Sequence, residues 1–305
     1  VKQQTIASQS FLINSNQMRI TGHRIADVIY EKLTGDRGVF STRIAYVTKQ
    51  GPRFQLVVAD VDGADPQTVV SSNEPILSPK WAPDGTRLAY VSFEQKKPIV
   101  YVQNMATGRR AAIANFRGSN SSPAWSPDSR QLAVTLTRDG NSQIFIMNAE
   151  GGEVRRVMSS PGIDTEACYT PDGKSLLFTS DRGGSPQIYR INIASGSVER
   201  VTFDGSYNVS PRALPDGKGI VYVRRDGGRF QVAILDYATR QTQVLTQGPD
   251  DESPSVAPNG KMILYANEIG GRGTLAAVSS DGRVKQRLSA SALDVREPAW
   301  GPLPQ

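Results

Sequence analysis

An aspartate that follows a proline recurs along this chain at nearly constant spacing, as Asp84, Asp128, Asp172 and Asp216. Such a carboxylate series raises the possibility of chemistry, because carboxylates act as general acids and bases and bind cations. Each aspartate, however, stands in a Pro-Asp-Gly turn or its Pro-Asp-Ser variant. In such turns proline presets φ, aspartate bonds its own backbone and glycine accepts positive φ. We therefore expect the series to be structural.

Nucleophilic catalysis lacks its usual residues. The only histidine is His23, on the polar face of an expected helix with Arg24, Asp27 and Tyr30. A catalytic base needs a nucleophile within reach and a partner that orients it, and the chain contains no Gly-x-Ser-x-Gly motif. His23 is therefore expected to be a solvated helix residue, and no catalytic residue is predicted. Histidine pairs and calcium-loop patterns are also absent from the sequence.

The prolines of these turns mark an internal repeat. They recur at steps of 44, 44, 44, 43 and 44 residues, at Pro83, Pro127, Pro171, Pro215, Pro258 and Pro302. A period in the low forties with four short apolar runs per unit is typical of a β-propeller. The first unit lacks an inner strand and the last supplies only that strand, at 298–300. The predicted fold is therefore an all-β, six-bladed β-propeller closed by the C-terminal strand.

Several residues beside the turns are expected in the core. Trp81, Trp125 and Trp300 end the inner strands and are predicted to anchor the packing. The only cysteine, Cys168, excludes an internal disulfide and a cysteine-based metal cluster. Its slot holds alanine in other copies, so we expect a small buried residue there.

Residues 1–40 do not share the repeat. We expect a strand at about residues 11–13 and an amphipathic helix at about 17–33, whose apolar face holds Met18, Ile25, Val28, Ile29 and Leu33. One strand and one helix cannot bury a core of their own. Residues 1–40 are therefore predicted to be the C-terminal remnant of an α/β domain, packed against a propeller that occupies residues 41–305.

The composition limits the classes of partner. The net charge is +6, but the basic residues are scattered among carboxylates without an aromatic ladder, so nucleic-acid binding is not expected. The sequence has no apolar run of membrane-spanning length, so no direct membrane insertion is expected. The chain opens at Val1 without a secretory signal, which indicates a cytosolic protein or a mature or truncated form.

The loops that lead into the inner strands vary, whereas the turns do not. In a propeller these loops converge on one mouth of the central channel, where they could bind a peptide or a protein loop. The predicted partner-binding residues of these loops are Ser119, Asn120, Asp164, Thr165, Glu166, Tyr207, Asn208, Asp251, Glu252, Arg296 and Glu297. A cation in the channel is a further possibility, near Asp164, Glu166 and Asp251, with Glu252 and Glu297 close by.

Longer phrases of the sequence resemble a known family. They are His-Arg-Ile-Ala-Asp-Val-Ile-Tyr-Glu-Lys-Leu-Thr-Gly at 23–35, Gly-Val-Phe-Ser-Thr-Arg-Ile-Ala-Tyr-Val at 38–47 and the Ser-Pro-x-Trp-x-Pro-Asp-Gly repeats. Together they resemble the TolB family of the Tol–Pal envelope system of Gram-negative bacteria. The resemblance covers essentially the whole chain, and the phrase at 23–47 is its most specific part.

The resemblance implies a periplasmic, non-enzymatic scaffold whose propeller mouth binds the lipoprotein Pal and is captured by group A colicins. It implies roles in outer-membrane integrity and cell division, and TolA engagement through N-terminal residues that this chain lacks. By position, the Pal- and colicin-contacting loops fall on Ser119, Asn120, Ser122, Thr165 and Glu166. Some relatives have a histidine where this chain has Ser119. The resemblance also implies Ca²⁺ in the channel and no other cofactor.

Pro-Asp-Gly repeats also occur in the propellers that gate serine peptidases. The alternative hypothesis is such a gating domain, with its catalytic part outside this chain. The closing strand near Pro302 argues against a hydrolase fused after it. A cytosolic propeller that binds nucleic acid is a third, weaker hypothesis, and strong salt-sensitive binding to a random duplex would support it.

Overall fold

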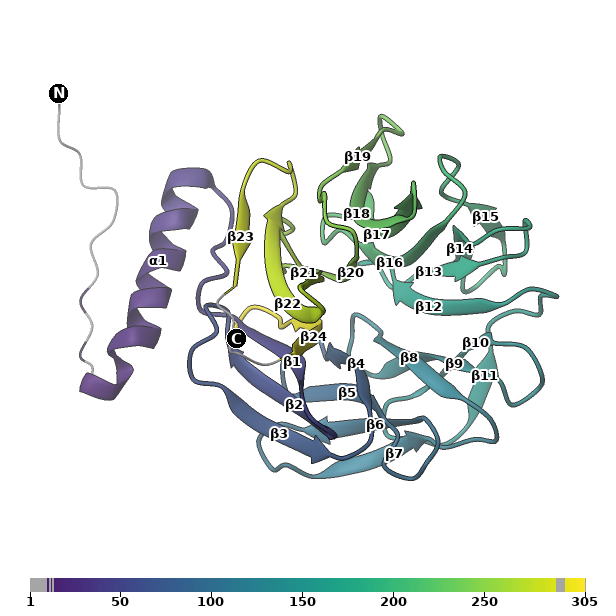
Figure 1. Ribbon diagram of the computed structural model, residues 1–305, viewed down its shortest axis with the longest axis horizontal. Coiled ribbons are helices and arrows are strands. Elements are labelled where there is room, and N and C mark those ends of the chain that lie inside the picture. The colour runs from purple at the N-terminus through teal and green to yellow at the C-terminus, as the bar shows by residue number, and fades with distance from the viewer. Residues whose placement is uncertain (1–9, 11, 13, 289–293, 305) are drawn as a thin grey trace.

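The computed structural model describes residues 10, 12, 14–288 and 294–304, and it forms six four-stranded antiparallel sheets around one axis (Figure 1). This confirms the predicted six-bladed β-propeller. The strand predicted at 11–13 falls largely outside the described residues. We number the blades in their order around the axis, which follows from the contacts between neighbouring sheets.

Each blade is given from its inner strand outward. Blade 1 contains β24 (Asp294–Trp300), β1 (Arg43–Gln50), β2 (Arg53–Asp60) and β3 (Gln67–Ser72). Blade 2 contains β4 (Ile76–Trp81), β5 (Arg87–Ser92), β6 (Ile99–Asn104) and β7 (Arg110–Ala114). Blade 3 contains β8 (Asn120–Trp125), β9 (Gln131–Leu136), β10 (Gln143–Asn148) and β11 (Val154–Arg156). Blade 4 contains β12 (Asp164–Tyr169), β13 (Ser175–Ser180), β14 (Gln187–Asn192) and β15 (Val198–Arg200). Blade 5 contains β16 (Asn208–Ala213), β17 (Gly219–Asp226), β18 (Arg229–Asp236) and β19 (Thr242–Val244). Blade 6 contains β20 (Asp251–Val256), β21 (Met262–Ile269), β22 (Arg272–Ser279) and β23 (Lys285–Arg287).

Blade 1 joins two distant parts of the chain, as predicted. The strand β24 pairs antiparallel with β1, with Ile44 opposite Trp300 and Thr48 opposite Val295. The pairing closes the ring, and it protects the inner edge of β1 from pairing with another chain.

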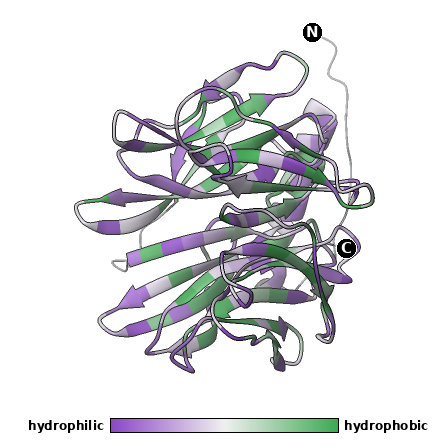
Figure 2. Cartoon of the chain, turned by 90° about the vertical axis from the view of Figure 1, so that its right-hand side faces the viewer, coloured by the Kyte–Doolittle hydropathy of each residue, from purple (hydrophilic) through white to green (hydrophobic). Residues whose placement is uncertain are grey.

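The hydrophobic core lies between the blades. Six clusters of buried residues each join two neighbouring blades, and the cluster of Ile44, Leu264 and Val295 joins blade 6 to blade 1. In Figure 2, hydrophobic stretches lie along the strands, while many loops are hydrophilic. Strands two and three of each blade are apolar on both faces because a neighbouring blade covers each face.

Every inner strand carries the same bulge. In blade 2, Ser78 and Pro79 together oppose the single residue Tyr90 of β5. The first bulged residue has a φ between 49° and 55° in every blade, at Ser78, Ser122, Glu166, Ser210, Ser253 and Glu297. We call these six residues the bulge ring. A residue other than glycine in this conformation costs about 1–3 kcal/mol and persists only where surrounding contacts hold it.

The helix α1 (Met18–Thr34) follows a short 3-10 turn, η1 (Ser15–Gln17), and confirms the predicted helix to within one residue. It ends at Gly35, whose φ of 79° suits glycine and whose N–H donates to the Glu31 carbonyl. No helix among the described residues is both long enough and apolar enough to cross a membrane.

The polar side of α1 faces the propeller. Asp27 Oδ1 accepts the Phe40 N–H at 2.7 Å, and Arg19 forms ion pairs with Asp60 and Asp62 of blade 1. The apolar face is open instead, with Met18 65% and Leu33 69% exposed.

The expectation of a solvated His23 is wrong. Its side chain is 19% exposed, and its Nε2 lies 3.1 Å from Asp62 Oδ2. The histidine is held there because the polar face of the helix is the face that packs on the propeller.

Candidate functional site

The inner strands all begin at the same end of the axis, which we call the mouth end. The residue directly before the bulge-ring residue of each inner strand lies there, and these six residues form the mouth ring: Leu77, Ser121, Thr165, Val209, Glu252 and Arg296. Leu77, Glu252 and Arg296 are exposed, and the other three are half-buried. Thr165, Glu252 and Arg296 were predicted from the sequence as partner-binding residues, whereas Leu77, Ser121 and Val209 were not.

Four predicted contact residues are instead buried. Asn120, Asp164 and Asn208 are 0% exposed and Asp251 is 1% exposed, so they cannot touch a partner docked at the mouth end. Their prediction as surface contacts is therefore corrected. Each is the first residue of its inner strand, and Asn120, Asn208 and Asp251 hydrogen-bond to the loop that precedes the strand.

Hydrogen bonds show what these buried residues do. Asn120 Oδ1 accepts the Phe116 N–H at 2.8 Å, and its Nδ2 donates to the Pro98 carbonyl at 3.1 Å. Asn208 Nδ2 donates to Gln187 Oε1 of blade 4 at 2.8 Å. These two side chains therefore fasten a loop and tie one blade to the next.

The two buried aspartates are bound in different ways. Asp164 Oδ1 pairs with the Arg182 guanidinium at 2.8 Å. Asp251 Oδ2 accepts the Gly248 N–H at 2.8 Å, and burial raises the pKa of Asp251 above its ordinary value. Asp164 Oδ2 and Asp251 Oδ1 are buried without a hydrogen-bond partner among the described residues.

Two glutamates of the bulge ring reach to the next blade. Glu166 accepts hydrogen bonds from the Ser210 N–H at 3.0 Å, the Ser210 hydroxyl at 2.6 Å and the Thr179 hydroxyl at 2.9 Å. Glu297 Oε2 accepts the Ser78 N–H at 3.3 Å. Blades 4 and 1 are opposite in the ring, so these two carboxylates lie on opposite sides of the axis.

Two cations stand one step deeper along the axis. Lys80 and Arg212 follow the bulge-ring residues of blades 2 and 5 by two positions. Burial, and then the charge of Arg212, lower the pKa of Lys80 to about 7, while Glu297, Cys168 and Glu166 oppose the shift. Burial raises the pKa of Glu297, and Lys80 opposes that shift. Since these groups belong to four different blades, their side chains share the axial space.

The remaining predicted contacts lie at the mouth end, where Ser119, Ser122 and Tyr207 are half-buried. The Ser119 N–H donates to Thr137 Oγ1 at 2.7 Å, and the Tyr207 ring meets Phe230 edge-on with centroids 6.0 Å apart. Thr165, Glu252 and Arg296 lie in the mouth ring, and Glu166 and Glu297 lie in the bulge ring.

The residues predicted near a cation do not form one coordination site. Asp164, Glu166 and Asp251 are each bonded separately, and blades 4 and 6 are not neighbours. Among the described residues, the one group of three metal-ligand side chains that converge is His23, Asp60 and Asp62. There the Arg19 guanidinium already contacts both carboxylates and supplies the positive charge.

Cys168 is half-buried and lies outside the hydrophobic clusters, so its prediction as a core residue is corrected. Cys168 occupies the strand position that Lys80 and Arg212 occupy in blades 2 and 5, two residues after the bulge-ring residue. Of the tryptophans, Trp125 is buried and donates Nε1–H to the Lys80 carbonyl at 2.9 Å, whereas Trp81 and Trp300 are half-buried.

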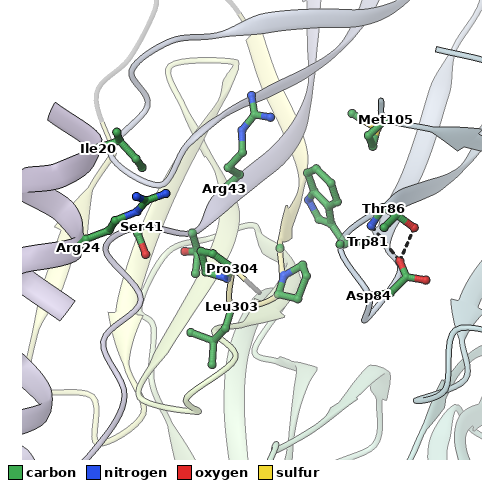
Figure 3. A pocket seen from close by; sticks show the side chains of 14 residues that line it. Ile20, Arg24, Ser41, Arg43, Trp81, Asp84, Thr86, Met105, Leu303 and Pro304 are labelled. Atoms are coloured by element: carbon green, nitrogen blue, oxygen red, sulfur yellow. Dashed lines mark hydrogen bonds between the residues drawn. The ribbon is translucent and has the colours of Figure 1, made fainter. Parts of the chain in front are cut away.

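A pocket of about 360 Å³ lies near the other end of the inner strands (Figure 3). Ile20 and Arg24 of α1, Trp81 and Asp84 of blade 2 and residues 301–304 of the chain line it. Trp81 Nε1 is buried there without a hydrogen-bond partner among the described residues. No pattern in the sequence indicates this pocket, because its walls come from three distant segments.

Comparison with known proteins adds independent observations. A family profile described as the TolB beta propeller domain matches residues 30–304. The Tol-Pal system protein TolB of Aromatoleum aromaticum is 76% identical over 99% of this chain and 71% of that protein. The protein of the same name from Methylobacillus flagellatus is 70% identical over 99% of this chain and 70% of its own length. The crystal structure of TolB from Acinetobacter baumannii matches with a TM-score of 0.94 at 46% identity, over 99% of this chain and 77% of that one.

Proposed function

This chain belongs to the TolB family of Tol–Pal system components, and from that premise we propose that it is a non-enzymatic periplasmic scaffold that docks the lipoprotein Pal. Docking takes place at the mouth end of the propeller axis, and group A colicins compete for the same surface. Through Pal the protein supports outer-membrane integrity and constriction of the envelope at division.

The observation that carries this proposal is the mouth ring. Its residues differ from blade to blade while the strands that carry them repeat, so the ring combines apolar Leu77 and Val209 with charged Glu252 and Arg296. A rigid scaffold that presents varied side chains at one end binds a partner without ordering loops of its own.

The described residues also lack a catalytic constellation. His23 is bonded to Arg19 and Asp62, and no serine, threonine or cysteine among the described residues hydrogen-bonds to it. The match to TolB proteins over 99% of the chain favours a scaffold over the peptidase-gating alternative, whose catalytic part would lie outside this chain. Engagement of TolA is proposed to use residues outside the propeller.

Calorimetric titration of the folded chain with Pal tests the proposal. We expect saturable binding that Glu252→Arg weakens by about 1 kcal/mol or more, because it reverses a charge at the centre of the docking surface. Ala106→Arg is the matched control, since it adds the same side chain in the exposed β6–β7 turn at the opposite end. Absence of binding, or equal loss in both variants, would overturn the proposal. A colicin translocation segment should displace Pal.

A further inference from the structure

Lys80 and Arg212 occupy the same position of their inner strands, in blades 2 and 5, which lie opposite each other in the ring. The charge of Arg212 acts on Lys80, and both act on Glu297. Both side chains therefore reach the axial space from opposite sides, one layer deeper than the bulge ring.

Neither cation is bonded to an anionic side chain within residues 14–288 and 294–304. Arg212 Nε is buried without a hydrogen-bond partner among the described residues, and its Nη1 donates to the neighbouring Pro211 carbonyl at 2.7 Å. Lys80 takes part in no side-chain hydrogen bond or ion pair within the described part of the chain. A buried N–H without an acceptor is costly, and an oxyanion between the two cations would supply acceptor oxygens to both.

The nearby carboxylates do not fill this place. Glu166 is engaged by Ser210 and Thr179, and Glu297 accepts the Ser78 N–H. Their oxygens are thus directed to donors of the bulge ring and β13, and no ion pair joins either of them to Lys80 or Arg212 among the described residues.

We propose that Lys80 and Arg212 form a binding site for a small oxyanion, a carboxylate or a phosphate group, on the propeller axis. The guanidinium offers a planar fork of donors to such a group, and the ammonium adds a mobile point charge. The sequence resemblance implied a cation in the channel, whereas the structure assigns the opposite sign of ligand to this layer. The site does not depend on the docking of Pal.

Titration with inorganic phosphate, and separately with acetate, in a chloride-free buffer of low ionic strength tests the site by calorimetry. We expect saturable binding at one site that Lys80→Met and Arg212→Met each weaken tenfold or more. Lys80→Arg keeps the charge and should retain binding. Lys218→Met removes an exposed cation from blade 5 and is the matched control. Circular dichroism of each variant shows whether it is folded.

No saturable binding of either anion by the folded chain would overturn the proposal. Equal affinity in all folded variants would do the same, since it would indicate an adventitious ion only. If Lys80→Met fails to fold, the ¹⁵Nε–¹Hε signal of Arg212 in the unaltered chain must shift with phosphate. Titrating Pal with and without phosphate separates the sources of the ligand. If phosphate weakens the binding of Pal, the natural ligand of the site is a carboxylate of the partner. If the affinity for Pal is the same with and without phosphate, the ligand is a free ion.

Discussion

The carboxylate of Glu166 accepts two hydrogen bonds from Ser210, from the backbone N–H at 3.0 Å and from the hydroxyl at 2.6 Å. Both residues have positive φ, and they belong to consecutive blades. One strained residue therefore holds the next in place across the boundary between two sheets. Glu297 repeats the arrangement on the opposite side of the ring, where it accepts the Ser78 N–H.

Removal of this carboxylate should destabilise the propeller. Glu166→Ala leaves the Ser210 and Thr179 hydroxyls without their acceptor, and the Ser210 N–H keeps only Thr179 Oγ1, so we expect the free energy of unfolding to fall by about 1–3 kcal/mol. Ser253→Ala is the control, because no hydrogen bond of the Ser253 side chain is found among the described residues. Urea denaturation gives both values. An equal loss in the two variants would show that the contact between blades contributes nothing specific.

The fold could be predicted from the sequence because its signals are local. The prolines of the turns, such as Pro83 and Pro127, repeat at constant spacing, and each is followed by an apolar strand. The missing inner strand of the first unit and the extra one at 294–300 then leave only one way to complete the ring. The helix end at Gly35 was equally readable, since glycine beyond an amphipathic run is typical of a helix terminus.

The site was harder to predict, because the direction of a polar side chain depends on the path of its loop. Asn120 and Asn208 stand beside mouth-end residues in the sequence, yet both are buried and bonded to the loops that precede them. The bulge ring contains no glycine, so the usual sign of positive φ was missing. Lys80 and Arg212 did leave a signal, since a charge in a slot that holds alanine in other copies indicates a position facing the axis.

The bulge ring predicts an unusual response to glycine. Ser253 has a φ of 53°, which glycine adopts freely and serine does not. We expect Ser253→Gly to raise the free energy of unfolding by up to about 1 kcal/mol, the relief of strain less the added entropy of the unfolded chain. Ser253→Val should lower it by about 1 kcal/mol or more, because branching at Cβ disfavours this conformation.

The midpoints of urea denaturation compare these two variants with the unaltered chain. Ser280→Gly is the control, since Ser280 does not have positive φ and glycine there should only destabilise. If Ser280→Gly stabilised the chain as much as Ser253→Gly, the gain could not be due to relief of the positive φ at Ser253.

The half-buried Lys80 predicts the pH dependence of stability. Its pKa is about 7 in the folded chain, against 10.5 for an ordinary lysine, because burial and then Arg212 disfavour the charged form. Between these two values the unfolded chain binds more protons than the folded one, so the free energy of unfolding should rise with pH. Lys80→Met lacks this contribution.

Denaturation at several pH values between neutral and alkaline measures the effect. From neutral to alkaline pH, the free energy of unfolding of the unaltered chain should rise by at least about 1 kcal/mol more than that of Lys80→Met. The groups that share the space with Lys80, which are Arg212, Glu166, Glu297 and Cys168, are present in both proteins. If the free energy of unfolding changed equally with pH in the two proteins, the lowered pKa of Lys80 would be contradicted.

Asp164 and Thr165 are adjacent in β12, and the structure predicts opposite consequences for their replacement. Asp164 is 0% exposed and paired with Arg182, so Asp164→Ala leaves a partly buried cation without its partner and should cost about 3–5 kcal/mol of stability. Thr165 belongs to the mouth ring, so Thr165→Arg should change the free energy of unfolding by less than about 0.5 kcal/mol.

Thr165→Arg should also weaken Pal docking by about 1 kcal/mol or more, because the long side chain occupies the docking surface. Denaturation and calorimetry on the same preparations separate the two effects, with Ala106→Arg as the control for the added charge. Strong destabilisation by Thr165→Arg, or full stability of Asp164→Ala, would show that these two side chains have been placed on the wrong sides of the strand.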